Sequence, residues 1–80
     1  MAERRKSSNS FGIILRTYRQ GNGLTQEQLS ERVDVVRSFI CALENGKKQP
    51  SLDMIFRLAS ALEVKPGELV DAAAEKSAGR

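Results

Sequence analysis

The chain has 80 residues, a net charge of +3, one cysteine and no histidine. This length supports one small domain with a marginal core, and the composition excludes an internal disulfide and a histidine-based metal site. No apolar run approaches the roughly 20 residues of a membrane-spanning helix, and no hydrophobic signal region follows the charged N-terminus. We therefore expect a cytoplasmic protein without a membrane partner.

The first ten residues, MAERRKSSNS, are polar, basic and serine-rich, which predicts a flexible arm. A first helix is expected from Phe11, because apolar residues then recur at the spacing of one helical face. Ser10 is its expected N-cap, and the GNG sequence at 21–23 predicts its end.

The sequence LTQEQL contains the strongest helix start in the chain. Thr25 and Gln28 have the spacing of a capping box, and the two flanking leucines have that of a hydrophobic staple. A second helix should therefore begin at Gln26. It should end in a tight turn at Asp34, since aspartate tolerates left-handed backbone better than most residues.

Three further helices are expected after this turn. The third covers about 36–45 and ends at Gly46, in the position of a glycine cap. The fourth starts at Pro50 and Ser51, and a short fifth begins near Pro66, a good first-turn residue. No strand pairs or repeats are visible in the sequence. The predicted fold class is all-α, with five short helices around one core.

The outer face of the third predicted helix has an unusual composition. At about 100° per residue, its large apolar residues gather on one side, which should face the core. The opposite side carries short or uncharged side chains, one long cation and no carboxylate: Arg37, Ser38, Cys41, Ala42 and Asn45. Such a face can lie close to a groove wall, and a DNA major groove roughly 12 Å wide admits one helix.

The segment LTQEQLSERVDVVRSFICALENGKKQPSLDMIFRLASALEVKPGEL, with FGIILRTYRQGNG before it, resembles the Cro and phage-repressor (XRE) family of helix-turn-helix regulators. The resemblance covers residues 11 to about 70. It implies a five-helix, lambda-repressor-like DNA-binding domain whose third helix lies in the major groove and whose dimers read two half-sites. The implied parts are a basic arm at 1–10, the domain at 11–74, with its helix-turn-helix at about 25–45, and a frayed tail at 75–80.

The resemblance also implies roles for individual residues. It implies that Arg37, Ser38 and Ala42 contact bases, with Cys41 beside them. Phosphate contacts fall to Gln26 at the positive start of the second helix, and to a loop formed by Asn45, Lys47 and Lys48. Two residues, Arg19 and Glu44, match a pair that joins the first and third helices in relatives. The chain departs from the family pattern at Asp34, where glycine is usual, and at Val36, where serine or threonine is usual.

Three apolar residues near the C-terminus have two interpretations. They could belong to the core, but two adjacent apolar residues on a short helix often leave one uncovered, so we favour a dimer interface for Phe56, Leu69 and Val70. The basic arm is similarly open to two interpretations, an idle tail or a contact with the minor groove or phosphates.

The sequence thus predicts a sequence-specific regulator of transcription that binds double-stranded DNA as a homodimer on an inverted-repeat operator. No enzymatic activity, cofactor or small-molecule ligand is expected, because no nucleophile and base pair or metal set is present. The size resembles that of restriction-modification controller proteins, Cro-like regulators and some antitoxins. The alternative is a protein-interaction module with the same fold, whose binding would not weaken steeply with salt.

Overall fold

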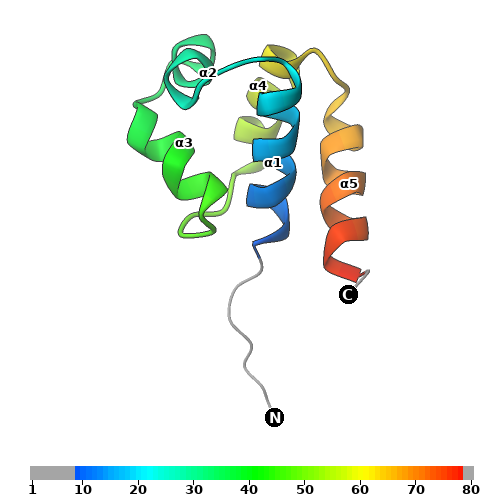
Figure 1. The fold of residues 1–80 in the computed structure, drawn as a ribbon. Helices are drawn as coiled ribbons and strands as arrows, with labels where there is room; N and C mark the ends of the chain where they lie inside the picture. The colour runs from blue at the N-terminus through cyan, green and yellow to red at the C-terminus, as the bar shows by residue number, and fades with distance from the viewer. Residues whose placement is uncertain (1–8, 79–80) are drawn as a thin grey trace.

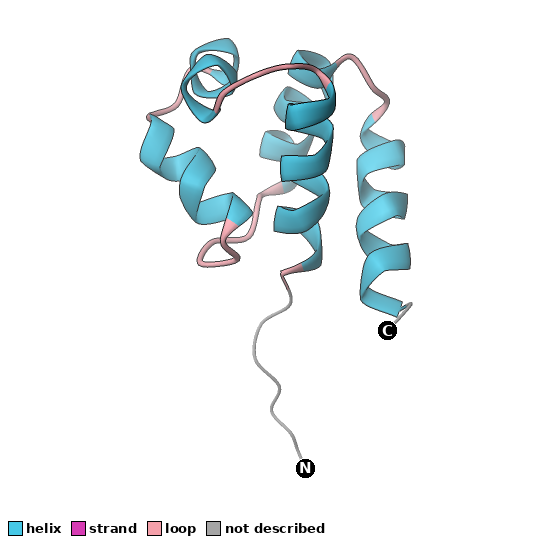
Figure 2. Cartoon of the chain, in the orientation of Figure 1, coloured by secondary structure: helices cyan, strands magenta, loops and turns pink. Residues whose placement is uncertain are grey.

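The computed structural model describes residues 9–78 and consists there of five α-helices joined by short loops (Figure 1). Figure 2 shows helices and loops, and no strand, within this range. The all-α, five-helix prediction is confirmed. The Arg4-Arg5-Lys6 segment of the predicted arm lies outside the described residues. The helices are α1 (Ser10–Gly21), α2 (Gln26–Val33), α3 (Arg37–Glu44), α4 (Leu52–Leu62) and α5 (Pro66–Ala78).

The predicted start and end of α2 are confirmed by its hydrogen bonds and backbone. Thr25 Oγ1 accepts from the Gln28 N–H at 3.0 Å, and the Thr25 N–H donates to Gln28 Oε1 at 2.9 Å, which completes the capping box. Asp34 ends the helix in a left-handed conformation, with φ 62° and ψ 49°. The Val35 N–H then bonds back to the Ser30 carbonyl at 3.0 Å, which closes the turn before α3.

The start of α3 differs from the sequence prediction by one residue. Val36 has extended backbone, with φ −75° and ψ 151°, and makes no side-chain capping bond, so α3 begins at Arg37. Its end agrees with the prediction, because Gly46 follows the helix with a positive φ of 80° that favours glycine. Helix α4 begins where expected, and Ser51 is its N-cap, with its Oγ accepting from the Met54 N–H at 3.0 Å.

The prediction of Ser10 as the cap of α1 is wrong. Ser10 is the first helical residue, and Asn9 occupies the cap position without a side-chain capping bond. The Asn9 side chain instead lies against Gly12 and Gly46. If either glycine carried a Cβ atom, Asn9 Oδ1 would be only 2.5 Å from it at Gly12 and 2.6 Å at Gly46. Asn9 therefore fills the space between the start of α1 and the loop after α3.

Helix α5 is longer than expected and continues to Ala78, through part of the segment that was predicted to fray from residue 75. Its sequence AAAEKSA is rich in good helix formers. The helix also has support from a neighbour, since α5 packs against α1 along its side in Figure 1. Tyr18 Oη on α1 donates to Glu68 Oε2 at 3.0 Å across this contact.

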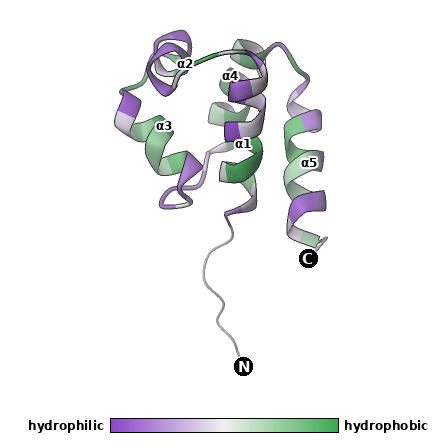
Figure 3. Ribbon diagram, in the orientation of Figure 1, coloured by the Kyte–Doolittle hydropathy of each residue, from purple (hydrophilic) through white to green (hydrophobic). Residues whose placement is uncertain are grey.

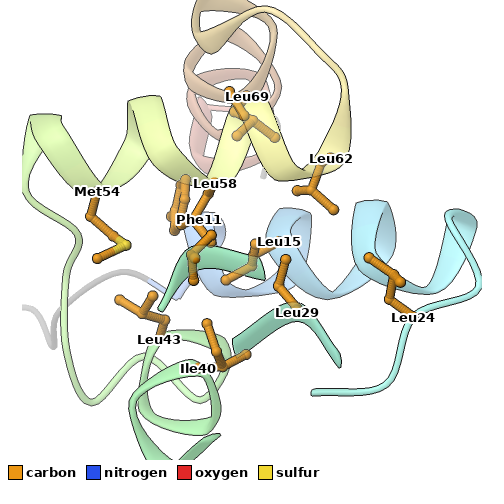
Figure 4. Packing of buried hydrophobic residues seen from close by; sticks show 12 residues of the cluster. Phe11, Leu15, Leu24, Leu29, Ile40, Leu43, Met54, Leu58, Leu62 and Leu69 are labelled. Carbon is orange, nitrogen blue, oxygen red and sulfur yellow. The ribbon is translucent and has the colours of Figure 1, made fainter. Parts of the chain in front are cut away.

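The core lies between all five helices, and α1 is central to it because it packs against both α3 and α5 (Figure 4). A Cβ on Gly12 would lie 2.5 Å from the carbonyl oxygens of Leu43 and Glu44, so only glycine allows α1 to approach the end of α3 this closely. The largest fully buried apolar side chains are Leu15, Leu29, Ile40, Leu43, Leu58, Leu62 and Leu69.

Candidate nucleic-acid interface

The four residues predicted to face bases lie on the outer side of α3. Arg37 and Ser38 are exposed, whereas Cys41 and Ala42 are half-buried. The other side of the helix is buried in the core. Hydrophilic residues, purple in Figure 3, also lie along α2 and in the loop after α3. The structure thus combines a helix of short outward side chains with polar neighbours at both ends.

The loop after α3 is held against the end of that helix. The N–H groups of Lys47 and Lys48 both donate to the Ala42 carbonyl, at 2.9 and 3.3 Å. Asn45 Nδ2 lies 3.4 Å from Cys41 Sγ. Asn45 and both lysines are exposed, so the loop holds the backbone of two cationic residues beside the C-terminal end of α3.

A buried ion pair joins α1 to α3, as the resemblance implied. Arg19 Nε donates to Glu44 Oε2 at 2.6 Å, and Arg19 Nη2 donates to Glu44 Oε1 at 3.0 Å. Arg19 Nη1 also donates to the Leu24 carbonyl at 2.8 Å. Both side chains are largely removed from solvent, with residue exposures of 8% for Arg19 and 1% for Glu44. Their predicted structural role is confirmed.

The surroundings of Glu44 keep its carboxylate ionised. Burial raises the pKa of Glu44, but the hydrogen bonds from Arg19, Gln26 and Arg16 and the charge of Arg19 outweigh burial, so the pKa lies below its ordinary value. The hydrogen bond with Glu44 in turn raises the pKa of Arg19 against the opposing effect of burial. Both partners are charged at neutral pH.

Gln26 is more constrained than a solvated phosphate ligand would be. Its Nε2 donates to Glu44 Oε1 at 3.1 Å, and its Oε1 accepts from Arg37 Nη1 at 3.4 Å. Arg37 Nε also lies 4.0 Å from Glu27 Oε1. An amide nitrogen carries two N–H groups, so the bond to Glu44 leaves one N–H for another acceptor. A phosphate contact by Gln26 therefore stays a prediction. Sequence reasoning missed that Gln26 bonds to both Glu44 and Arg37, and that Glu27 lies beside Arg37, because no local pattern connects these residues.

The three residues predicted at a dimer interface do not share one environment. Phe56 on α4 and Val70 on α5 are 50% and 44% exposed, and Leu52, one turn before Phe56, is 64% exposed. Leu69 is fully buried in the protomer's own core. Its assignment to an interface is therefore wrong, since its side chain already packs within the protomer.

A shallow groove of about 380 Å³ lies beside Phe56, between α4 and the end of α2. Two arginines bridge these helices: Arg57 Nη2 donates to the Val33 carbonyl, and Arg32 Nη1 donates to the Ala61 carbonyl at 3.2 Å. Across residues 9–78 we find no helix long and apolar enough to span a membrane. The same range contains no group of three or more His, Cys, Asp or Glu residues arranged to hold a metal ion.

The turn between α2 and α3 and the exposed outer face of α3 define a helix-turn-helix domain. A family model described as "Helix-turn-helix" matches residues 15–69. The chain therefore belongs to the helix-turn-helix family of XRE-type DNA-binding transcriptional regulators.

Individual relatives agree with this family. The chain is 51% identical over 49 residues to an uncharacterised HTH-type transcriptional regulator of Methanothermobacter thermautotrophicus, a match that covers 61% of this chain and 71% of the relative. It is 36% identical over 62 residues to the control protein C.BamHI of Bacillus amyloliquefaciens, which covers 76% of each chain. Among solved structures, the restriction-modification controller protein C.AhdI from Aeromonas hydrophila is 40% identical with a TM-score of 0.73, over 75% of this chain and 91% of that one.

Proposed function

We propose that this protein binds double-stranded DNA as a homodimer and reads an inverted-repeat operator with one α3 helix in the major groove of each half-site. The observation that supports this most is the outer face of α3. It combines one projecting arginine with short side chains, and an ordered lysine loop follows directly. A helix with this surface can approach base edges closely.

In this proposal Arg37 supplies the main base contact. Its side chain is 59% exposed and starts the recognition helix, and a guanidinium can donate to O6 and N7 of one guanine together. Ser38 can accept or donate one hydrogen bond, and Ala42 and Cys41 leave room for base edges. We therefore expect at least one guanine in each half-site.

Phosphate contacts would hold the helix in register. Lys47, Lys48 and Asn45 follow α3, and Gln26 lies at the N-terminal end of α2, where unpaired N–H groups favour an anion. Contacts of this kind position a protein on the duplex without reading its sequence.

Two copies are needed to read an inverted repeat, and the exposed apolar side chains of α4 and α5 offer a surface for pairing. Phe56 and Val70 keep their predicted role in this proposal, with Leu52 added and Leu69 removed. An isologous dimer would bury the same residues twice. The descriptions of C.BamHI as a control protein and of C.AhdI as a restriction-modification controller support a controller-type role over an antitoxin role.

Selection from random duplex DNA tests the proposal. We expect recovery of an inverted repeat whose half-sites contain a shared guanine, and an affinity that falls steeply as salt rises. If no sequence is enriched and binding to DNA is weak and insensitive to salt, the fold serves as a protein-interaction module instead.

A further inference from the structure

A continuous set of hydrogen bonds connects the buried ion pair to the exposed recognition arginine. Arg19 donates to Glu44, Glu44 accepts from Gln26, and Gln26 accepts from Arg37. The last two contacts join residues 18 and 11 positions apart in the chain. Glu44 is 1% exposed, whereas the side chain of Arg37 is 59% exposed. The bonds therefore run from the core to the exposed face of α3.

The buried end of this set decides which way the Gln26 amide points. An ionised carboxylate only accepts hydrogen bonds, so the Gln26 group facing Glu44 must be the NH₂. The reverse orientation would put the Gln26 oxygen against Glu44 Oε1 at a distance of about 3 Å, which would leave two acceptors in contact. With the nitrogen turned towards Glu44, the oxygen is presented to Arg37 Nη1, where it can only accept.

Arg37 would otherwise be a long, flexible side chain. An arginine side chain loses up to about 2 kcal/mol of rotamer entropy when it becomes fixed. Gln26 Oε1 contacts its Nη1, and Glu27 Oε1 lies 4.0 Å from its Nε, so the first turn of α2 approaches the guanidinium at two positions. A donor that is already oriented loses less entropy when it meets its acceptor.

We propose that Gln26, oriented by buried Glu44, is a positioning residue that sets the direction in which Arg37 meets its base. Discrimination at the guanine then depends on the first turn of α2 as well as on α3. This inference rests on the proposed function. It differs from a phosphate contact by Gln26, because loss of a phosphate contact would weaken binding to every sequence by the same factor.

Gln26→Met tests the inference, because methionine keeps the length of the side chain and removes both hydrogen bonds. The matched control is Gln20→Met, the same change at an exposed residue of α1. Each variant is combined with Arg37→Ala, and binding is measured to the selected site and to the same site with the guanine pair replaced. Thermal melts verify that the variants are folded.

We expect Gln26→Met to lower the preference for the guanine site by roughly threefold to tenfold, as for other directly coupled pairs. In the Arg37→Ala background the same change should not alter the preference, and Gln20→Met should not alter it in either background. If Gln26→Met weakens binding to both sites by the same factor, and this effect adds to that of Arg37→Ala, the inference is overturned. Gln26 is then a phosphate ligand.

A second measurement needs no DNA. Nitrogen-15 relaxation of the Arg37 Nε–H reports how ordered the guanidinium is in the free protein. We expect its order parameter to fall in Gln26→Met and to stay at the wild-type value in Gln20→Met. An unchanged value in Gln26→Met would overturn the inference, even if the wild type showed no sequence preference and the proposed function had failed.

Discussion

Arg19 Nε lies 2.6 Å from Glu44 Oε2, so α1 and the last residue of α3 are joined inside the protein. The contact uses both carboxylate oxygens, because Arg19 Nη2 donates to Oε1. Gly12 permits it by letting α1 approach the backbone of Leu43 and Glu44. This pair of charges therefore fastens the C-terminal end of α3 to α1.

Loss of one member of this pair should be strongly destabilising. We expect Glu44→Ala to lower the free energy of unfolding by about 3–5 kcal/mol, because Arg19 would remain buried without a counter-charge. Denaturant unfolding measures the change, and Glu31→Ala, at an exposed carboxylate of α2, is the control. A loss of less than about 1 kcal/mol, the range of exposed pairs, would show that the ion pair contributes little.

The same carboxylate should make stability depend on acid pH. The folded pKa of Glu44 lies below its ordinary value of about 4.3, so its contribution is complete above that pH. As pH falls through the folded pKa, the contribution is lost, because the unfolded chain binds a proton more readily. Unfolding of the wild type and Glu44→Gln between about pH 7 and about pH 3 should show a smaller acid-dependent loss in the variant. Parallel curves would assign the acid sensitivity to other groups.

Arg37→Ala should relax the preference at the guanine pair while the fold stays intact. A bidentate contact is worth roughly 1–3 kcal/mol of discrimination, and the neighbouring side chains on α3 are too short to replace it. Arg37→Lys should recover only part of the preference, since an ammonium lacks the planar fork. Competition binding to sites varied at each position measures both. Equal weakening for all sequences would mean that Arg37 holds a phosphate.

Lys47→Ala combined with Lys48→Ala should weaken binding to specific and random duplexes alike, because phosphate contacts carry no sequence information. Each lost contact should flatten the plot of log affinity against log salt by roughly one unit per monomer. The control is Lys65→Ala with Lys76→Ala, which removes the same charge near α5. A salt slope that matches the wild type would leave both loop lysines merely solvated.

Phe56→Glu combined with Val70→Glu should lower the affinity of dimerisation by at least about tenfold, since two charges would enter an apolar interface. Sedimentation across a concentration series measures it. Ile13→Glu, at an exposed apolar residue of α1, should leave the dimer unchanged. If the double variant stays dimeric at micromolar concentration, the interface lies elsewhere. Leu69→Glu is unsuitable for this test because it would disrupt the core.

The sequence by itself determined most of the local structure. The Thr25 capping box, the tight turn at Asp34, the glycine cap at Gly46 and the start of a helix at Ser51 were all predicted, and the structure contains each of them. These features depend on residues at most a few positions apart, so backbone geometry and side-chain chemistry decide them without the rest of the fold. The outer face of α3 was predictable for the same reason, since helical spacing fixes which residues share a side.

Tertiary structure alone decided which exposed and buried positions have partners. Leu69 and Val70 are adjacent and both apolar, and only the packing of α5 on α1 and α4 buries the first and exposes the second. The contacts of Gln26 with Glu44 and Arg37 join residues on two different helices, so the periodicity of a single helix does not predict them. Such contacts exist only when folded helices meet, because the long-range geometry that aligns their side chains is absent from any local stretch of the chain.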